Sequence, residues 1–327
     1  MIENSLAHLQ KVVRNKTIVN LNDYALACRD FLIFLQTTSP TRIVARPTRN
    51  SHYIFYQYGN SYEHRITRPL NTRLFMEMPS EFERAFERFM TFLADLKQHQ
   101  ETVLERKGAR EYIESNELNK VVYTMQQSLG CVGDSFENSN QARKIMGQLF
   151  ESMVKLIIQD VGVVCEPRTI KVPIPGYPDQ MMSFELDVVF SRNKVIITAE
   201  TKDQYIHASE IVGSVKTTSK DRIDKIFLDK YFLTRLLQRD IPVVAIFLHD
   251  VQRAAYTQRL DTSGDNLFGI ASTFKTNHFL AYTVAFNKLN GVYYVDPRPE
   301  MVSKDKLREQ IRNFQQFLVK DLWIFSR

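Results

Sequence analysis

The sequence predicts an α/β fold in which a mixed sheet is flanked by helices, preceded by a mainly helical N-terminal region. Three observations support this prediction. The second half of the chain alternates helical and strand-like segments, in the order that builds layered α/β domains. Pro242–Leu248 is a continuous apolar run, which is typical of a strand buried on both faces. Residues 3–37 instead carry apolar side chains at helical spacing.

The N-terminal region is expected to contain helices interrupted by one strand-like segment. Two helices are expected within residues 3–37, and the aromatic run 51–58 predicts a strand. A further helix is expected from Pro79 to about Gln127. The polar, glycine-containing stretch 130–140 predicts a linker. We therefore expect two domains, 1–135 for recognition of a ligand and 136–327 for catalysis.

The second half is expected to supply the layered core. The predicted elements are a helix at about 141–160, strands near 163–174, 183–190 and 194–201, a helix at Arg222–Arg239, strands at Pro242–Leu248, 279–286 and 291–295, and a helix at about 303–320.

Composition sets limits on the class of protein. The 327 residues are 44% hydrophobic and 24% charged, as in ordinary globular proteins. No stretch approaches the roughly 18 apolar residues of a membrane span, and no signal peptide is recognisable, so no membrane partner is expected. Three scattered cysteines predict a reducing, cytoplasmic location and small apolar packing roles. A net charge of +6 suits a polyanionic partner.

The most informative motif joins two strand-like segments. Asp187 lies in the first, and Glu200 and Lys202 lie at the end of the second. Residues i and i+2 of a strand project to the same face, so Glu200 and Lys202 project together. Asp187 can meet them from the neighbouring strand. Two carboxylates and one ammonium group can bind a hard cation and stabilise charge. The alternative is a solvated salt bridge at a strand end.

These residues resemble the PD-(D/E)xK nucleases, and most closely the type II restriction endonucleases. The resemblance covers about 145–250, although Leu186 replaces the proline of the motif name. It implies that Asp187 and Glu200 bind Mg²⁺, that Lys202 is the catalytic lysine, and that Glu151 on the preceding helix is a further catalytic and metal-binding acid. A restriction-endonuclease-like core and cleavage of double-stranded DNA by a homodimer are also implied.

A second basic segment offers a different catalytic lysine. Similar Lys-Thr-Thr-x-x-Asp-Arg stretches occur in some restriction endonucleases, where the lysine belongs to the active site. The rival site would combine Asp187 with Lys216 and an acid from the next helix, such as Asp229. We favour Lys202 and expect this segment to lead into a helix and to contact the DNA backbone. The expected contacts are Lys216, Thr217, Lys220 and Arg222. The alternative is a capped, solvated helix start.

The segment 42–73 is rich in arginine and tyrosine, with Glu63 as its single acid. Arginine can bind guanine or phosphate, so this segment is a candidate recognition surface. Arg46 and Arg49 are the residues expected to contact DNA, because they flank Pro47 in a non-helical stretch. The alternative is a basic hairpin packed together by its aromatic side chains.

Three functions remain open from the sequence. The first is a Mg²⁺-dependent, sequence-specific restriction endonuclease. The second is a DNA repair or junction-resolving nuclease with the same core. The third is a DNA-binding protein with a decayed nuclease fold, which the set of Asp187, Glu200 and Lys202 opposes.

Overall fold

The computed structural model describes residues 6–15, 17–45, 52–58, 66–99, 115–193, 205–255 and 268–326. The chain divides into two compact units, each built from several segments of sequence. The first unit comprises Met1–Phe92, Ser115–Met153 and Asp250–Thr273, and the second comprises Leu93–Glu114, Val154–His249 and Phe274–Arg327. None of the described helices is both long and apolar enough to cross a membrane.

The first unit is mainly helical, as the sequence predicts. Its helices are α1 (Leu6–Arg14), α2 (Leu21–Thr38), most of α3 (Pro79–Gln98), α5 (Glu117–Asp134) and the first part of α6 (Ser139–Asp160). Three antiparallel strands form a small sheet, namely β1 (Thr41–Val44), β2 (Tyr53–Gln57) and β3 (Leu70–Asn71). A separate pair of strands, β8 (Val251–Ala255) and β9 (Phe268–Ser272), also belongs to this unit.

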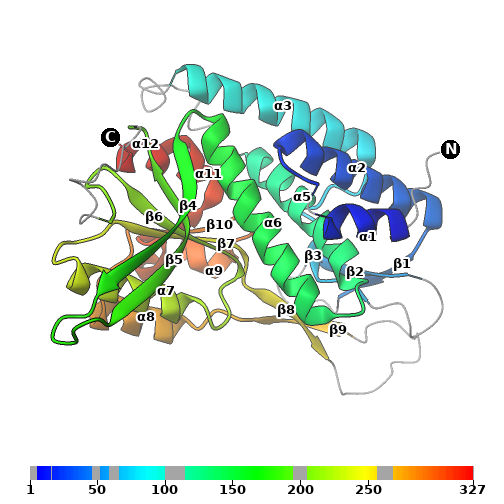
Figure 1. Cartoon of the computed structure of the whole chain (residues 1–327). Coiled ribbons are helices and arrows are strands. Elements are labelled where there is room, and N and C mark those ends of the chain that lie inside the picture. Colours follow the sequence, from blue (N-terminus) through cyan, green and yellow to red (C-terminus); the bar gives the residue numbers. More distant parts are fainter. Residues whose placement is uncertain are drawn as a thin grey trace. The chain divides into compact units, whose positions relative to one another are not determined.

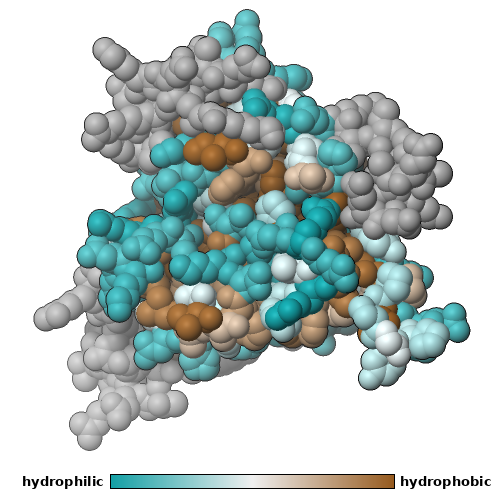
Figure 2. Space-filling model, turned by 90° about the vertical axis from the view of Figure 1, so that its left-hand side faces the viewer, coloured by the Kyte–Doolittle hydropathy of each residue, from teal (hydrophilic) through white to brown (hydrophobic). Residues whose placement is uncertain are grey.

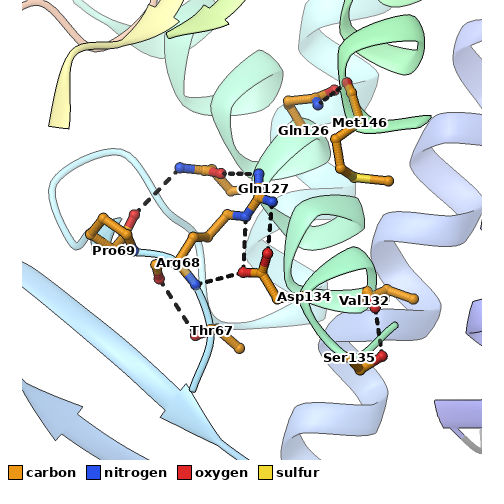
Figure 3. Close-up of polar contacts among 9 residues, drawn as sticks. All are labelled: Thr67, Arg68, Pro69, Gln126, Gln127, Val132, Asp134, Ser135 and Met146. Atoms are coloured by element: carbon orange, nitrogen blue, oxygen red, sulfur yellow. Dashed lines mark hydrogen bonds and ion pairs between the residues drawn. The ribbon is translucent and has the colours of Figure 1, made fainter. Parts of the chain in front are cut away.

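Helix α5 is buried along nearly its whole length, so its polar side chains must find partners inside the protein. Gln126 donates to the carbonyl of Met146 on α6 at 3.0 Å (Figure 3). The Thr124 hydroxyl accepts from Met76 N at 3.1 Å. The linker expected at 130–140 is therefore wrong. Gly130 lies inside α5, and only a short turn separates Asp134 from the start of α6.

The presence of a glycine at position 130, inside helix α5, is explained by the side chain of Arg68 that lies against it. A Cβ atom at Gly130 would collide with Arg68 Nη1, so glycine leaves room for the guanidinium group where it lies. Arg68 binds Asp134 through its backbone N at 2.7 Å and through Nη2 at 3.0 Å (Figure 3). Its Nη1 donates to Gln127 Oε1 at 3.4 Å. Burial lowers the pKa of the Arg68 guanidinium, but the charge and hydrogen bonds of Asp134 outweigh this effect, and the pKa is raised.

The second unit contains a six-stranded mixed sheet in the order β11-β10-β7-β6-β5-β4. The strands are β4 (Val164–Pro173), β5 (Met181–Ser191), β6 (Ile211–Thr218), β7 (Val243–His249), β10 (Gly291–Tyr294) and β11 (Ile311–Asn313). Pairing is antiparallel between β4 and β5 and between β5 and β6, and parallel across β6, β7, β10 and β11.

Helices cover both faces of this sheet (Figure 1). The helices α7 (Ile223–Leu236), α8 (Thr276–Ala285), α9 (Pro299–Ser303) and α10 (Asp305–Arg308) add side chains to one apolar cluster with β5, β6, β7 and β10. The C-terminal helices are α11 (Phe314–Gln316), a π-helical turn (Phe317–Asp321) and α12 (Leu322–Phe325). Phe317 contacts Tyr293 of β10 and Phe190 of β5, with ring centroids 4.9 and 5.9 Å apart. The predicted α/β class with a helix-flanked mixed sheet is thus confirmed.

Two predicted elements of the second half are wrong, and one lies outside the described residues. The expected strand 279–286 is helix α8, because Phe279 and Thr283 are buried one helical turn apart while Val284 is exposed. The expected helix 303–320 is broken by β11, whose three residues are too few to show an alternating pattern. The expected strand 194–201 falls outside the described residues.

Apolar residues on the surface are dispersed. The face seen in Figure 2 is mostly hydrophilic, with small apolar patches separated by polar residues. In the second unit the exposed large apolar side chains include Val164, Tyr177, Met181 and Leu228, on different elements or turns. Single exposed apolar residues are normal for a folded protein. The three cysteines are free and buried, in agreement with the packing role expected of them.

The contact between Arg68 and Asp134 yields a stability prediction. Replacing Arg68→Ala should lower the free energy of unfolding by about 3–5 kcal/mol, because Asp134 is left partly buried without its partner. Arg73→Ala is the matched control, since the Arg73 side chain is exposed, and should change stability by no more than about 0.5 kcal/mol. Urea denaturation of both variants measures the difference. Equal, small changes would contradict a structural role for Arg68.

Candidate active site

A β-bulge places Asp187 in an unusual position on β5. In the pairing of β4 with β5, Glu166 lies opposite Val189 and Arg168 lies opposite Leu186. Two residues, Asp187 and Val188, therefore face the single residue Pro167. Proline has no N–H group to donate to the ladder, and a bulge accommodates this loss. Bulges bend a strand and redirect a side chain, which here is the Asp187 carboxylate.

Strands β5 and β6 stop pairing at the same point. Their ladder includes Phe190 with Ile211 and ends with Val188 opposite Gly213. A Cβ atom at Gly213 would lie 2.6 Å from Val188 Cγ2, so glycine permits the close approach of the two strands at the bulge. Beyond this pair, β6 continues through Ser214 to Thr218 beside β7. The end of the β5–β6 ladder is therefore fixed by the bulge on one strand and by glycine on the other.

The Asp187 carboxylate replaces the backbone pairing that ends there. Its Oδ2 atom accepts from Val215 N at 2.8 Å, from the Ser214 hydroxyl at 3.1 Å and from Lys216 Nζ at 2.6 Å. The side chains of Asp187 and Lys216 are 15% and 29% exposed, so the ion pair is shielded but still reachable from solvent. Among the described residues, no donor binds Asp187 Oδ1. One oxygen of the carboxylate is thus held and the other is available to a ligand.

The structure brings together Asp187 and Lys216, which is the rival pairing from the sequence. Glu200 and Lys202, which we favoured, lie outside the described residues. Glu151 lies on α6 in the part assigned to the first unit. Asp229 lies on α7, where its carboxylate binds Lys225 Nζ at 3.3 Å. Strand β6 therefore supplies the described lysine nearest to the carboxylate of Asp187.

The segment containing Lys216 begins as a strand and then leads into a helix, as expected. Lys216 and Thr217 lie in β6, and α7 begins only at Ile223. The polar residues Ser214, Lys216 and Thr218 follow the alternation of a strand, whereas Lys220 and Arg222 lie in the turn that leads into α7.

The turn between β6 and α7 carries the other two predicted DNA contacts. Ser219 is buried, whereas Lys220 and Arg222 are exposed. Asp221 adopts φ of 50°, a left-handed conformation that aspartate tolerates in turns. Lys220 and Arg222 are therefore accessible to a polyanion, as the sequence prediction requires, and their contact with DNA stays a prediction.

An ion pair that the sequence does not reveal orders the chain before β6. Arg168 Nη1 and Nη2 on β4 bind Glu210 at 2.6 and 2.7 Å, and Glu210 is almost completely buried. Glu210 also accepts from the backbone N of His207 at 2.8 Å. Bidentate pairs of this kind fix geometry as well as energy. The start of β6 is therefore tied to the strand whose Pro167 faces the bulge.

Part of the basic segment 42–73 has structural roles. Arg42 binds Glu77 through Nε and Nη2, both at 3.0 Å, and Arg68 binds Asp134. The side chains of Tyr53, Tyr56 and Tyr58 are buried. For these residues the hairpin packed by its aromatic side chains is the correct interpretation. Arg46 and Arg49 lie outside the described residues, so their contact with DNA stays a prediction.

The available metal ligands are oxygen atoms. Within the part of the chain that the structure describes, no group of three or more His, Cys, Asp or Glu side chains could hold a metal ion. That part excludes Glu200. Asp187 Oδ1 is a hard oxygen ligand of the kind that Mg²⁺ prefers, and Mg²⁺ sites often use only one or two carboxylates together with water and phosphate oxygens. The donor chemistry at Asp187 thus fits Mg²⁺.

Comparisons with known proteins agree with this architecture. No family model matches the sequence, and no curated protein matches it. The structure is similar to the crystal structure of the type IIP restriction endonuclease Kpn2I, with a TM-score of 0.65 and 17% sequence identity over 99% of this chain and 98% of that chain. The complex of restriction endonuclease PspGI with substrate DNA matches with a TM-score of 0.41 and 14% identity, over 72% of this chain and 92% of that chain. The likeness to Kpn2I shows that the protein has a restriction-endonuclease-like fold.

The close approach at the bulge can be tested by substitution. Gly213→Ala should lower the free energy of unfolding by about 1–3 kcal/mol, because the new methyl group collides with the stiff side chain of Val188. Gly147→Ala on α6 is the matched control, since its Cβ meets nothing within 4 Å. It should be neutral or stabilise by up to about 1 kcal/mol.

A second substitution identifies the cause. In the double variant Gly213→Ala, Val188→Ala, the collision is removed, so the loss should be smaller than the sum of the two single losses. Additive losses in denaturant titrations would show that Gly213 has no close contact with Val188.

Proposed function

We propose that the protein is a Mg²⁺-dependent, sequence-specific double-stranded DNA endonuclease of the type II restriction class. The observation that carries this proposal is the pair of Asp187 and Lys216 at the point where β5 and β6 stop pairing. The restriction-endonuclease-like fold supports it, and Kpn2I, which shares that fold, is a restriction endonuclease. The exposed residues Lys220 and Arg222 at the end of β6 suit a phosphate backbone.

Within this proposal, Lys216 is the catalytic lysine. Its Nζ atom lies 2.6 Å from the carboxylate that would hold the metal, which satisfies the geometry that a catalytic lysine requires. Lys202, favoured by sequence spacing, stays the alternative. With Lys216 the second acid would come from the next helix, such as Asp229, and with Lys202 it would be Glu200; Glu151 is proposed as a further ligand.

The chemistry divides between the residues and the ion. Asp187 Oδ1 would be the metal-binding oxygen, because Oδ2 already accepts three hydrogen bonds. When bound, Mg²⁺ supplies an acidic water and neutralises charge on the phosphate. Lys216 would orient the attacking water or donate to the phosphate oxygen on which charge develops. Val215 N and the Ser214 hydroxyl keep the carboxylate in place for both tasks.

Cleavage of both strands of a symmetric site would require two such sites, and we therefore propose a homodimer with twofold symmetry. Digestion of plasmid DNA in Mg²⁺ tests the function as a whole. Discrete, reproducible fragments are expected. Cleavage restricted to branched DNA would instead identify a junction-resolving nuclease, and binding without cleavage would identify a decayed nuclease fold.

The role of Asp187 gives a sharp prediction. Asp187→Asn should abolish plasmid cleavage in Mg²⁺ while DNA binding is largely retained, because the metal ligand is lost and the groove contacts are not. Asp305→Asn serves as the control, since Asp305 is an exposed acid on α10 that pairs with Arg308, and should cleave normally. Cleavage by Asp187→Asn at the wild-type rate would refute the assignment.

The two lysines are separated by single-turnover kinetics at saturating DNA. Lys216→Ala should lose about 100-fold or more in the cleavage step, as expected for a group that acts in proton transfer or charge stabilisation. Lys202→Ala should retain cleavage, and Lys306→Ala, at an exposed residue of α10, controls for the loss of a positive charge. If Lys202→Ala is inactive and Lys216→Ala only weakens binding, the site uses Lys202.

A further inference from the structure

Strands β8 and β9 form a two-stranded antiparallel ribbon, pairing Val251 with Ser272 through Ala255 with Phe268. The ribbon follows β7 of the second unit in sequence but belongs to the first unit. One side of it is apolar and packs on the sheet of β1, β2 and β3. There Val251, Phe268 and Ile270 join a cluster with Phe55 and Ala45, and the rings of Phe55 and Phe268 lie 5.8 Å apart. The ribbon is therefore anchored to the segment that precedes Arg46.

Arg253 lies opposite Ile270 and so projects from the same face of the ribbon as Val251 and Phe268, yet its side chain is exposed. Arg253 is exposed, and its guanidinium carbon lies 5.1 Å from the centroid of the Phe268 ring. Among the described residues, Arg253 forms no ion pair. Stacking on a ring restrains the planar guanidinium group while its N–H groups stay available for hydrogen bonds in the plane. Such an arginine is pre-organised for bidentate recognition.

Chain connectivity limits how far Arg253 can lie from the end of β7. His249, the last residue of β7, is paired with Thr218, two residues after Lys216. Arg253 follows His249 by four residues, so its Cα lies within about 14 Å of that of His249 even in a fully extended chain. The major groove of B-DNA is about 12 Å wide and admits a two-stranded β-ribbon. A two-stranded ribbon such as β8–β9 therefore suits the major groove.

We infer that the β8–β9 ribbon enters the major groove of the DNA substrate and that Arg253 reads a guanine through its O6 and N7 atoms. Arginine is the residue that most often makes this specific contact. The inference rests on the proposed function only in requiring that the protein binds duplex DNA. It assigns to Arg253 a role in sequence specificity and none in the cleavage chemistry.

Binding selection tests this role without depending on cleavage. The Asp187→Asn variant of the full chain is used to select a preferred duplex from a pool of random sequences in a buffer containing Ca²⁺. Fluorescence anisotropy then measures the affinity for the selected duplex and for a scrambled duplex of equal length. The variants compared carry Arg253→Ala, Arg253→Lys or Arg235→Ala in the same background. Arg235 is the matched control, because it is also exposed and stacks on a ring, that of Tyr231 at 5.5 Å on α7.

The expected result is a loss of affinity for the selected duplex that is much larger than the loss for the scrambled duplex. Arg253→Ala should weaken binding of the selected duplex by about 5- to 150-fold and of the scrambled duplex much less. Arg253→Lys should restore little, because lysine keeps the charge but not the bidentate geometry. Arg235→Ala should leave both affinities unchanged.

Two outcomes would overturn the inference. Equal losses on both duplexes, with the slope of log K against log salt reduced by about one, would mean that Arg253 contacts a phosphate only. Unchanged binding would mean that the ribbon does not contact DNA. Failure of the wild-type protein to cut the selected duplex in Mg²⁺ would instead count against the proposed endonuclease function alone, since the binding measurements stand without it.

Discussion

The hydrogen bonds of Asp187 Oδ2 connect two strands at the point where their backbone ladder ends. Pro167 cannot donate to β5, the bulge of Asp187 and Val188 lies opposite it, and Gly213 allows β6 to approach closely. The carboxylate then takes over from the backbone, accepting from Val215 N and from Lys216 Nζ. This single arrangement orients a lysine, leaves one carboxylate oxygen available and ends the pairing of β5 with β6. The proposed chemistry depends on all three of these features.

Local sequence patterns predicted the fold class and the strand that carries Asp187, but they could not choose the lysine. Apolar runs and their spacing identify strands such as β5 and β7 without knowledge of their neighbours. The choice between Lys202 and Lys216 depends on which later strand pairs beside β5, and that is a long-range property. Spacing favoured Lys202, yet β6 is a described neighbour of β5 and carries Lys216. In the (D/E)xK motif an acid stands two residues before the lysine. In β6 that position is occupied by Ser214.

The arginine content of segment 42–73 was also misleading, because it too ignores residues that are distant in sequence. Arg42 and Arg68 look like free positive charges in sequence, but their partners Glu77 and Asp134 lie 35 and 66 residues further along the chain. Of the tyrosines between them, Tyr53, Tyr56 and Tyr58 are buried. A surplus of arginine over nearby acids therefore measures local charge only. Arg253 is the opposite case, because it is an exposed arginine on a short strand that no sequence pattern distinguished and that the ring of Phe268 holds in place.

The central claim, that Asp187 binds a divalent ion beside Lys216, is tested most directly by counting bound Mn²⁺, a paramagnetic substitute for Mg²⁺. The electron paramagnetic resonance signal of free Mn²⁺ is titrated with protein and a short duplex, and the ions bound by the duplex alone are subtracted. The account predicts about one Mn²⁺ or more per wild-type chain, loss of that binding in Asp187→Asn, and normal binding in Asp305→Asn. Equal Mn²⁺ binding by Asp187→Asn and the wild type would contradict it.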